Sequence, residues 1–224
     1  MNPRPVLHLV SFLLMVLGGA MGLCGGVGWI HDDPTRALWG MSVAAAITMV
    51  GGVVLWATTR GVIELTTRDG IGVVTFGWLA ACLVGALPYL LTGSIPSFLD
   101  AVFETVSGLT TTGASIVPDP ALLPRGVVFW RALTSFFGGM GILVLCVAIL
   151  PLLGSGGMQI YRAEASGVAQ DRLKPRIAST AKLMWGIYIL MNGVLILLLH
   201  YGGMSWLDAM CHSFTAVATS GFST

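Results

Sequence analysis

Long apolar runs dominate this chain of 224 residues, and short clusters of charged residues separate them. Each run reaches about the 20 residues that a helix needs to cross a bilayer, and a nearly uncharged run of that length predicts a membrane-spanning helix. The five predicted spans are residues 6–30, 37–57, 71–92, 127–153 and 183–201. Pro88 interrupts the third span near its end, because a proline inside a helix removes a backbone hydrogen bond.

Two semi-polar stretches, residues 97–115 and 205–223, are rich in Thr, Ser and Gly and too short to span a bilayer. They align without a gap at an offset of 108 residues, and seven of the 19 aligned positions are identical. The identical pairs are Ser97/Ser205, Leu99/Leu207, Asp100/Asp208, Ala101/Ala209, Thr111/Thr219, Gly113/Gly221 and Ser115/Ser223. Each copy follows a full span, so the repeating unit is a span, a short re-entrant element and a further span. Such repeats are typical of membrane transport proteins.

Each copy opens with a Ser-x-x-Asp pattern, which is typical of a helix start. The serine can accept a hydrogen bond from the first free N–H groups, and the aspartate favours the positive end of the helix dipole. We expect a helix of about 12 residues, or roughly 18 Å, which reaches the middle of the bilayer. Its negative C-terminal end would then face the membrane centre, a location that favours a cation.

The sequences TTTGAS and ATSGFS follow these helices. Backbone outside a helix is tolerated at this depth only if it is buried in protein or lines a water-filled path. Gly113 and Gly221 can adopt a positive φ, and such a turn can direct successive carbonyl oxygens at an ion that has lost its hydration shell. A single TTTG tract would be weak evidence against an ordinary loop, but two copies in register favour an ion path. No acid, base or nucleophile is needed, so no catalytic residue is predicted.

Composition excludes the soluble classes, because charged residues make up 9% of the chain where a globular domain has roughly 25%. The formal charge of +1 leaves no basic footprint for nucleic acid. His200, Asp208 and His212 suggest a metal site, but Glu104 occupies the position equivalent to His212, so the repeat does not preserve the set. We therefore predict no metal site beyond the ion path.

The basic residues predict the orientation. Eight would share the cytoplasmic side with the N-terminus: Arg4, Arg60, Arg68, Arg162, Arg172, Lys174, Arg176 and Lys182. Three would lie outside: Arg36, Arg125 and Arg131. This asymmetry places both repeated stretches on the outer side. Arg131 has two interpretations, as an anchor that reaches the membrane interface or as an ion-pair partner of Asp100 or Glu104.

The sequence resembles the Trk/Ktr/HKT superfamily of potassium uptake proteins, and within it the bacterial Trk-type membrane subunit. The segments that resemble it are SGLTTTGAS (107–115), FWRALTSFFGGMGILVL (129–145), GGMQIYRAE (156–164), LKPRIASTA (173–181) and ATSGFST (218–224). The resemblance implies four span–pore–span units around one pore. It places potassium at filter residues Thr111, Thr112, Gly113, Thr219, Ser220 and Gly221. Ser220 departs from the glycine that many relatives have there.

The resulting prediction is an all-α integral membrane protein of the bacterial cytoplasmic membrane that takes up potassium. Two leading helices (1–60) precede a complete unit (61–153), a cytoplasmic loop (154–182) and an incomplete second unit (183–224). The chain would be the N-terminal half of such a protein. The resemblance also implies a homodimer in the lipid bilayer and a cytoplasmic nucleotide-binding regulatory subunit, with potassium as the transported ion and no organic cofactor. The alternatives are a non-conducting fragment and an ion-coupled carrier of another solute. An intramembrane enzyme is disfavoured because the spans carry no nucleophile–base set.

Overall fold

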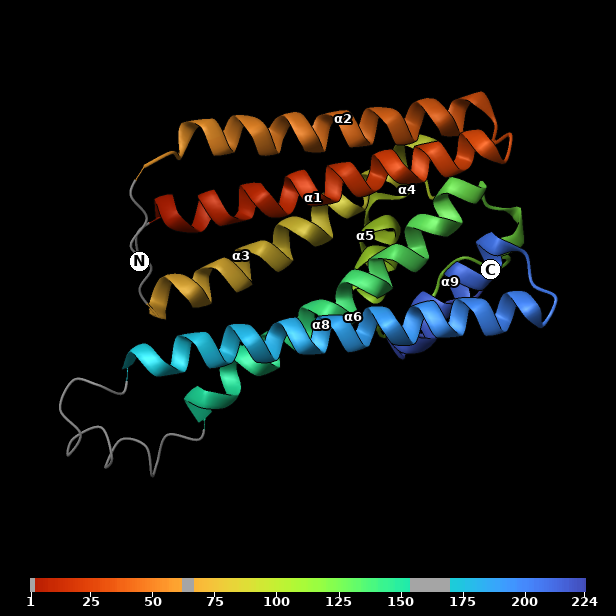
Figure 1. The fold of residues 1–224 in the computed structure, drawn as a ribbon. Coiled ribbons are helices and arrows are strands. Elements are labelled where there is room, and N and C mark those ends of the chain that lie inside the picture. The colour runs from red at the N-terminus through yellow and green to blue at the C-terminus, as the bar shows by residue number, and fades with distance from the viewer. Residues whose placement is uncertain (1–2, 62–66, 154–169) are drawn as a thin grey trace.

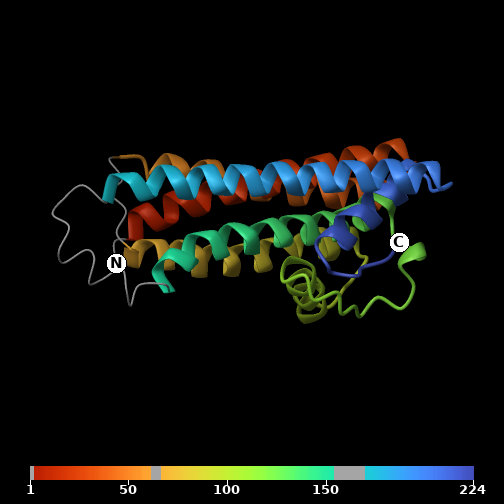
Figure 2. The same ribbon diagram turned by 60° about the horizontal axis from the view of Figure 1, so that its bottom comes forward.

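The computed structural model describes residues 3–61, 67–153 and 170–224, and every regular element in these ranges is helical. The long helices run side by side, and the helices α5 (Phe98–Leu109) and α9 (Trp206–Val217), of 12 residues each, lie in the same half of the molecule (Figures 1 and 2). The predicted all-α fold is confirmed.

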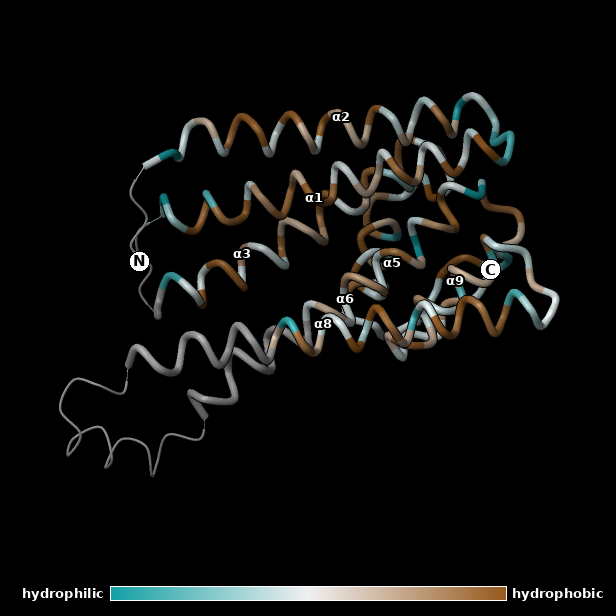
Figure 3. The backbone as a smooth tube through the Cα atoms, viewed as in Figure 1, coloured by the Kyte–Doolittle hydropathy of each residue, from teal (hydrophilic) through white to brown (hydrophobic). Residues whose placement is uncertain are grey.

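The first two helices form an antiparallel hairpin. Helix α1 (Pro3–Ile30) turns at residues 31–34 into α2 (Thr35–Thr58). Small residues set their separation, because a Cβ added to Gly18 would come within 2.8 Å of the Met49 backbone nitrogen. The middle of α2 is mostly apolar and the turn is polar (Figure 3).

The third predicted span is broken where Pro88 led us to expect it. Helix α3 (Thr67–Gly85) ends, and the short helix α4 (Leu87–Thr92) continues after Ala86 with Pro88 in its first turn. The carbonyl of Gly85 at the break accepts a hydrogen bond of 3.0 Å from the indole nitrogen of buried Trp130. The break is therefore satisfied by a tertiary contact.

The remaining elements are α5 (Phe98–Leu109), the 3-10 turn η1 (Pro120–Leu122), α6 (Arg125–Leu153), α8 (Gln170–Tyr201) and α9 (Trp206–Val217). Four stretches of the described chain are long and apolar enough to cross a membrane: Pro3–Ile30, Thr35–Thr58, Asp69–Thr92 and Ala181–Tyr201. They match four of the five predicted spans. The one predicted span not among these four, 127–153, lies along α6. The structure does not describe the side chains of α6 from residue 142 on.

Helix α8 differs from the prediction at its start. It begins at Gln170, although residues up to 182 were expected to form a loop. The helix therefore extends beyond its apolar segment, which begins at Ala181. The rest of the predicted loop, residues 154–169, lies outside the described residues.

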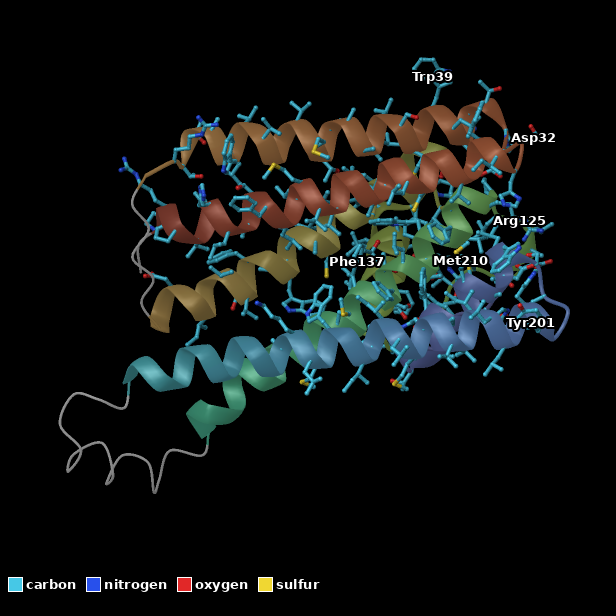
Figure 4. The ribbon with its side chains drawn as sticks, in the orientation of Figure 1. Asp32, Trp39, Arg125, Phe137, Tyr201 and Met210 are labelled. Carbon is cyan, nitrogen blue, oxygen red and sulfur yellow. The ribbon has the colours of Figure 1, made fainter. Side chains whose placement is uncertain are left out.

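Helix α6 lies at the centre and contacts α1, α5, α8 and α9. Asp33, in the turn of the hairpin, joins α1 and α2 to this helix. Its carboxylate accepts hydrogen bonds of 2.8 Å from the backbone nitrogens of Arg125 and Gly126, the first residues of α6. Asp32, Arg125 and Tyr201 lie at the same end of the molecule (Figure 4). The short helices α5 and α9 lie in the half of the molecule nearer this end (Figure 1).

Candidate ion-conduction site

Both repeated stretches begin as helices of 12 residues, as predicted. The Ser97 hydroxyl accepts from the backbone nitrogen of Asp100 at 3.5 Å, and the Ser205 hydroxyl accepts from that of Asp208 at 3.1 Å. The predicted serine caps are therefore confirmed in both copies.

The first short helix ends in a turn that closes two backbone hydrogen bonds. The nitrogens of Thr111 and Thr112 donate to the carbonyls of Gly108 and Ser107 at 3.0 and 2.9 Å. This is the Schellman arrangement, in which the residue after the helix cap is left-handed. That residue is Thr111, with φ of 55°.

The second short helix ends in the same way. The nitrogens of Thr219 and Ser220 donate to the carbonyls of Ala216 and Thr215 at 3.0 and 2.8 Å, and Thr219 has φ of 58°. The sequence prediction missed this role, because it assigned a positive φ only to the glycines. A left-handed threonine costs roughly 1–2 kcal/mol more than a glycine. The identity of Thr111 and Thr219 in the repeat was the available signal.

The predicted glycines do have positive φ, 74° at Gly113 and 87° at Gly221. In each copy a left-handed threonine and a left-handed glycine flank one residue with an ordinary φ. Alternation of the sign of φ turns successive peptide planes to the same side, so neighbouring carbonyl oxygens can face one direction. In the described part of the chain, no donor contacts the carbonyl oxygens of Thr111, Thr112, Thr219 or Ser220.

The two turns contact each other. A Cβ built on Gly113 would overlap the carbonyl oxygen of Ser220, so the first turn can approach the second only without a side chain at this position. Ser220 is buried, Thr111 and Gly113 are half-buried, and the remaining predicted site residues, Thr112, Thr219 and Gly221, are exposed. The structure thus places the two turns that carry the six predicted residues next to each other.

One face of α6 supports both turns. Gly138 packs against the carbonyl of Leu109 at the end of α5, while Gly139 lies against Ala218 at the end of α9. The hydroxyl of Ser135 donates to that of Ser220 at 2.9 Å. Gly138 and Gly139 thus allow α6 to approach both short helices closely.

Arg131, one turn earlier on α6, forms a buried ion pair with Glu104 of α5. Its Nε lies 2.8 Å from Oε1 of Glu104, and the side chains are 2% and 0% exposed. Of the two interpretations of Arg131, the ion pair is confirmed, and its partner is Glu104. The stripe Arg131, Ser135, Gly138 and Gly139 follows helical periodicity, a signal that the sequence analysis did not use.

Residues 41–224 match the family model of the TrkH cation transport proteins. The chain belongs to this family. It is 41% identical to the Trk system potassium uptake protein TrkH of Salmonella typhimurium and 40% identical to that of Escherichia coli K12. Each alignment covers 100% of this chain and 47% of the relative. The chain therefore spans about half the length of the relatives it matches.

The fold agrees with a solved member of the TrkH family. The crystal structure of the potassium transporter TrkH from Vibrio parahaemolyticus superposes with a TM-score of 0.83 at 34% sequence identity, over 100% of this chain and 44% of that one. The resemblance to a Trk-type membrane subunit is thus confirmed. The prediction of a transport protein rather than an enzyme is confirmed by membership of a cation transport family.

A cavity of about 430 Å³ in this TrkH-family chain lies beside the two turns. Both left-handed threonines, Thr111 and Thr219, line it, and apolar side chains of α8 such as Ile187 and Met191 form another wall. The cavity is therefore lined by residues of both copies.

The histidines and aspartate considered for a metal have other contacts in this TrkH-family chain. His200 stacks on Trp206 with ring centroids 3.8 Å apart, and His212 lies 3.1 Å from the hydroxyl of Thr224. Asp208 accepts a hydrogen bond from Ser205. Among the described residues, no group of three or more His, Cys, Asp or Glu side chains could bind a metal ion.

Proposed function

We propose that this chain takes part in potassium uptake and contributes two filter turns to a pore lined by backbone carbonyls. The observation that carries the proposal is the meeting of two repeated turns, with the same alternation of φ, at Gly113 and Ser220. The potassium uptake relatives support the choice of ion.

Potassium is selected in such a pore by oxygen atoms that replace its hydration shell. The carbonyls of Thr111, Thr112, Thr219 and Ser220 would supply these oxygens. The Schellman turns use the earlier carbonyls of Ser107 and Thr215 internally, so the oxygens left for an ion begin at the left-handed threonines. The ion would pass from these carbonyls to the adjoining cavity.

The chain would lie in the bacterial inner membrane, with its N-terminus in the cytoplasm and both filter turns near the outer side. The basic residues support this orientation. A homodimer and a cytoplasmic nucleotide-binding regulatory subunit are proposed from the family resemblance. The segment GGMQIYRAE (156–164) of the predicted cytoplasmic loop lies outside the described part of the chain.

An ion-coupled carrier would need membrane-embedded side chains free to bind a solute. The buried charges of the site, Glu104 and Arg131, are instead paired with each other. The other alternative is a fragment that does not conduct ions, and the following experiment distinguishes it from the proposed potassium pore.

Growth of a potassium-uptake-deficient bacterium at low potassium tests the proposal. The chain would be expressed alone, and also joined to the remaining half of Escherichia coli TrkH or of Salmonella typhimurium TrkH. We expect the joined versions to restore growth and the chain alone to fail, because two turns cannot surround an ion. Failure of every joined version, with the protein present in the membrane, would refute potassium uptake.

A further inference from the structure

The guanidinium of Arg131 is the only arginine head group in the described chain that contacts both filter turns. Its burial is costly, because a charge taken out of water must be paired and hydrogen-bonded to be tolerated. A role in packing alone would be served better by an apolar residue of similar size. The contacts of this side chain therefore indicate what the charge does.

Its nitrogens donate to three different partners. Nε contacts Glu104, one terminal nitrogen contacts the carbonyl of Ser223 at 3.1 Å, and the other contacts the hydroxyl of Ser115 at 3.0 Å. Ser115 and Ser223 are equivalent positions of the repeat, two residues after each filter glycine. One planar group thus joins the same point of both turns. Its carbon also lies 4.2 Å from the centroid of the Phe222 ring, next to the second turn.

Glu104 completes this arrangement on the first turn. Its Oε1 accepts from the Ser115 hydroxyl at 2.9 Å, and its Oε2 accepts from the backbone nitrogen of Ile116 at 3.1 Å. The second copy has His212 in the equivalent position, and this ring contacts Thr224, the equivalent of Ile116. The Glu104 carboxylate is therefore present in the first copy alone, whereas Arg131, which it neutralises, contacts both copies.

We propose that Arg131 is a positioning residue for ion selection, which fixes the spacing between the two filter turns through its three-way contact. The inference rests on the proposed potassium pore. Discrimination between potassium and sodium depends on the placement of the carbonyls, so a change in the spacing of the turns alters selectivity. A lysine would keep the charge but could not reproduce the fixed fork of donors.

The test compares Arg131→Lys with Arg125→Lys in the growth-restoring full-length version. Arg125 begins the same helix, is 41% exposed and reaches Asp208 only at 3.9 Å, which makes it a matched control. Membrane abundance, potassium uptake and the potassium-to-sodium permeability ratio would be measured. We expect Arg131→Lys to lower the ratio about tenfold, as the loss of one or two hydrogen bonds implies. We expect Arg125→Lys to leave the ratio unchanged.

Ser115→Ala gives a second test if Arg131→Lys fails to accumulate. It removes one contact of the fork and leaves the buried ion pair intact, so we expect about a threefold fall in the ratio at normal abundance. An unchanged ratio in both variants, or in Ser115→Ala when Arg131→Lys is absent, would overturn the positioning role and leave the potassium pore standing. An unselective or inactive parent would instead refute the pore itself.

Discussion

The two copies of the short helix and turn have the same backbone but different surroundings. Both begin at a capping serine, run for 12 residues and end in a Schellman turn with a left-handed threonine. Gly113 of the first copy touches Ser220, whereas no atom lies within 4 Å of a Cβ placed on Gly221 in the described chain. The identical Leu99 and Leu207 are 76% and 4% exposed. The place of each copy within the fold, and not its local sequence, therefore sets how its side chains are packed.

This difference separates two kinds of residue in the repeat. Positions that fix the backbone, such as the caps and the left-handed Thr and Gly, are identical in the two copies. Glu104 and His212 are equivalent but contact different partners, the one Arg131 and the other Thr224. The repeat therefore preserves a backbone shape, and the differing positions adapt that shape to unequal neighbours.

The largest expected effect comes from a methyl group at the two glycines. Symmetry of the repeat alone predicts equal responses to Gly113→Ala and Gly221→Ala. The contact with Ser220 predicts a different order, because Gly113→Ala adds overpacking of about 1–3 kcal/mol to a left-handed strain of roughly 1–2 kcal/mol. We expect Gly113→Ala to abolish selective uptake and Gly221→Ala to reduce it moderately, as measured by rubidium uptake with and without sodium. Equal losses would show that the contact between the turns is unimportant.

A smaller effect is expected where the hairpin meets α6. Asp33→Asn removes a charged acceptor from two backbone nitrogens at the start of that helix, which we expect to cost about 1–3 kcal/mol. Asp32→Asn is the control, because Asp32 is exposed and asparagine tolerates its φ of 55°. Thermal unfolding of the purified protein in detergent would compare them. If both changes lowered the melting temperature equally, the hydrogen bonds that Asp33 accepts at the start of α6 would not be stabilising.

The smallest effect concerns the hydroxyl pair that ties the second turn to α6. Ser220→Ala and Ser135→Ala should each destabilise the protein by about 1 kcal/mol, because Ser135 is fully buried and donates to Ser220. The double variant should be less destabilised than the sum, as expected for residues in contact. Additive losses in the same unfolding assay would mean that the bond contributes nothing. The first turn has no serine at the position of Ser220, so this bond distinguishes the copies.

Local features of this fold could be predicted from the sequence, and long-range contacts could not. The spans, the break at Pro88 and the serine caps depend on residues close together in the chain. The contact of Asp33 with Gly126 joins residues 93 positions apart, and nothing in either segment indicates it. The positive φ of Thr111 was missed because threonine alone disfavours it, and the hydrogen bonds of the turn override that preference.

The start of α8 was missed for a different reason. Residues 170–182 are polar and carry several charges, which the apolar pattern assigned to a loop. A helix can continue beyond the apolar segment where its polar residues meet water. The apolar pattern therefore predicted the membrane-spanning segment but not the start of the longer helix that contains it.

Because Gly138 and Gly139 must each face a different short helix, the number of residues between Arg131 and Gly138 matters more for packing than which apolar residues they are. Neighbouring residues of a helix point about 100° apart, so these two glycines face α5 and α9 in different directions. One residue inserted between Arg131 and Gly138 would turn both glycines by that angle and move side chains into the backbone of both short helices. We therefore expect this segment of α6 to tolerate exchanges among apolar residues far better than the insertion or deletion of a single residue.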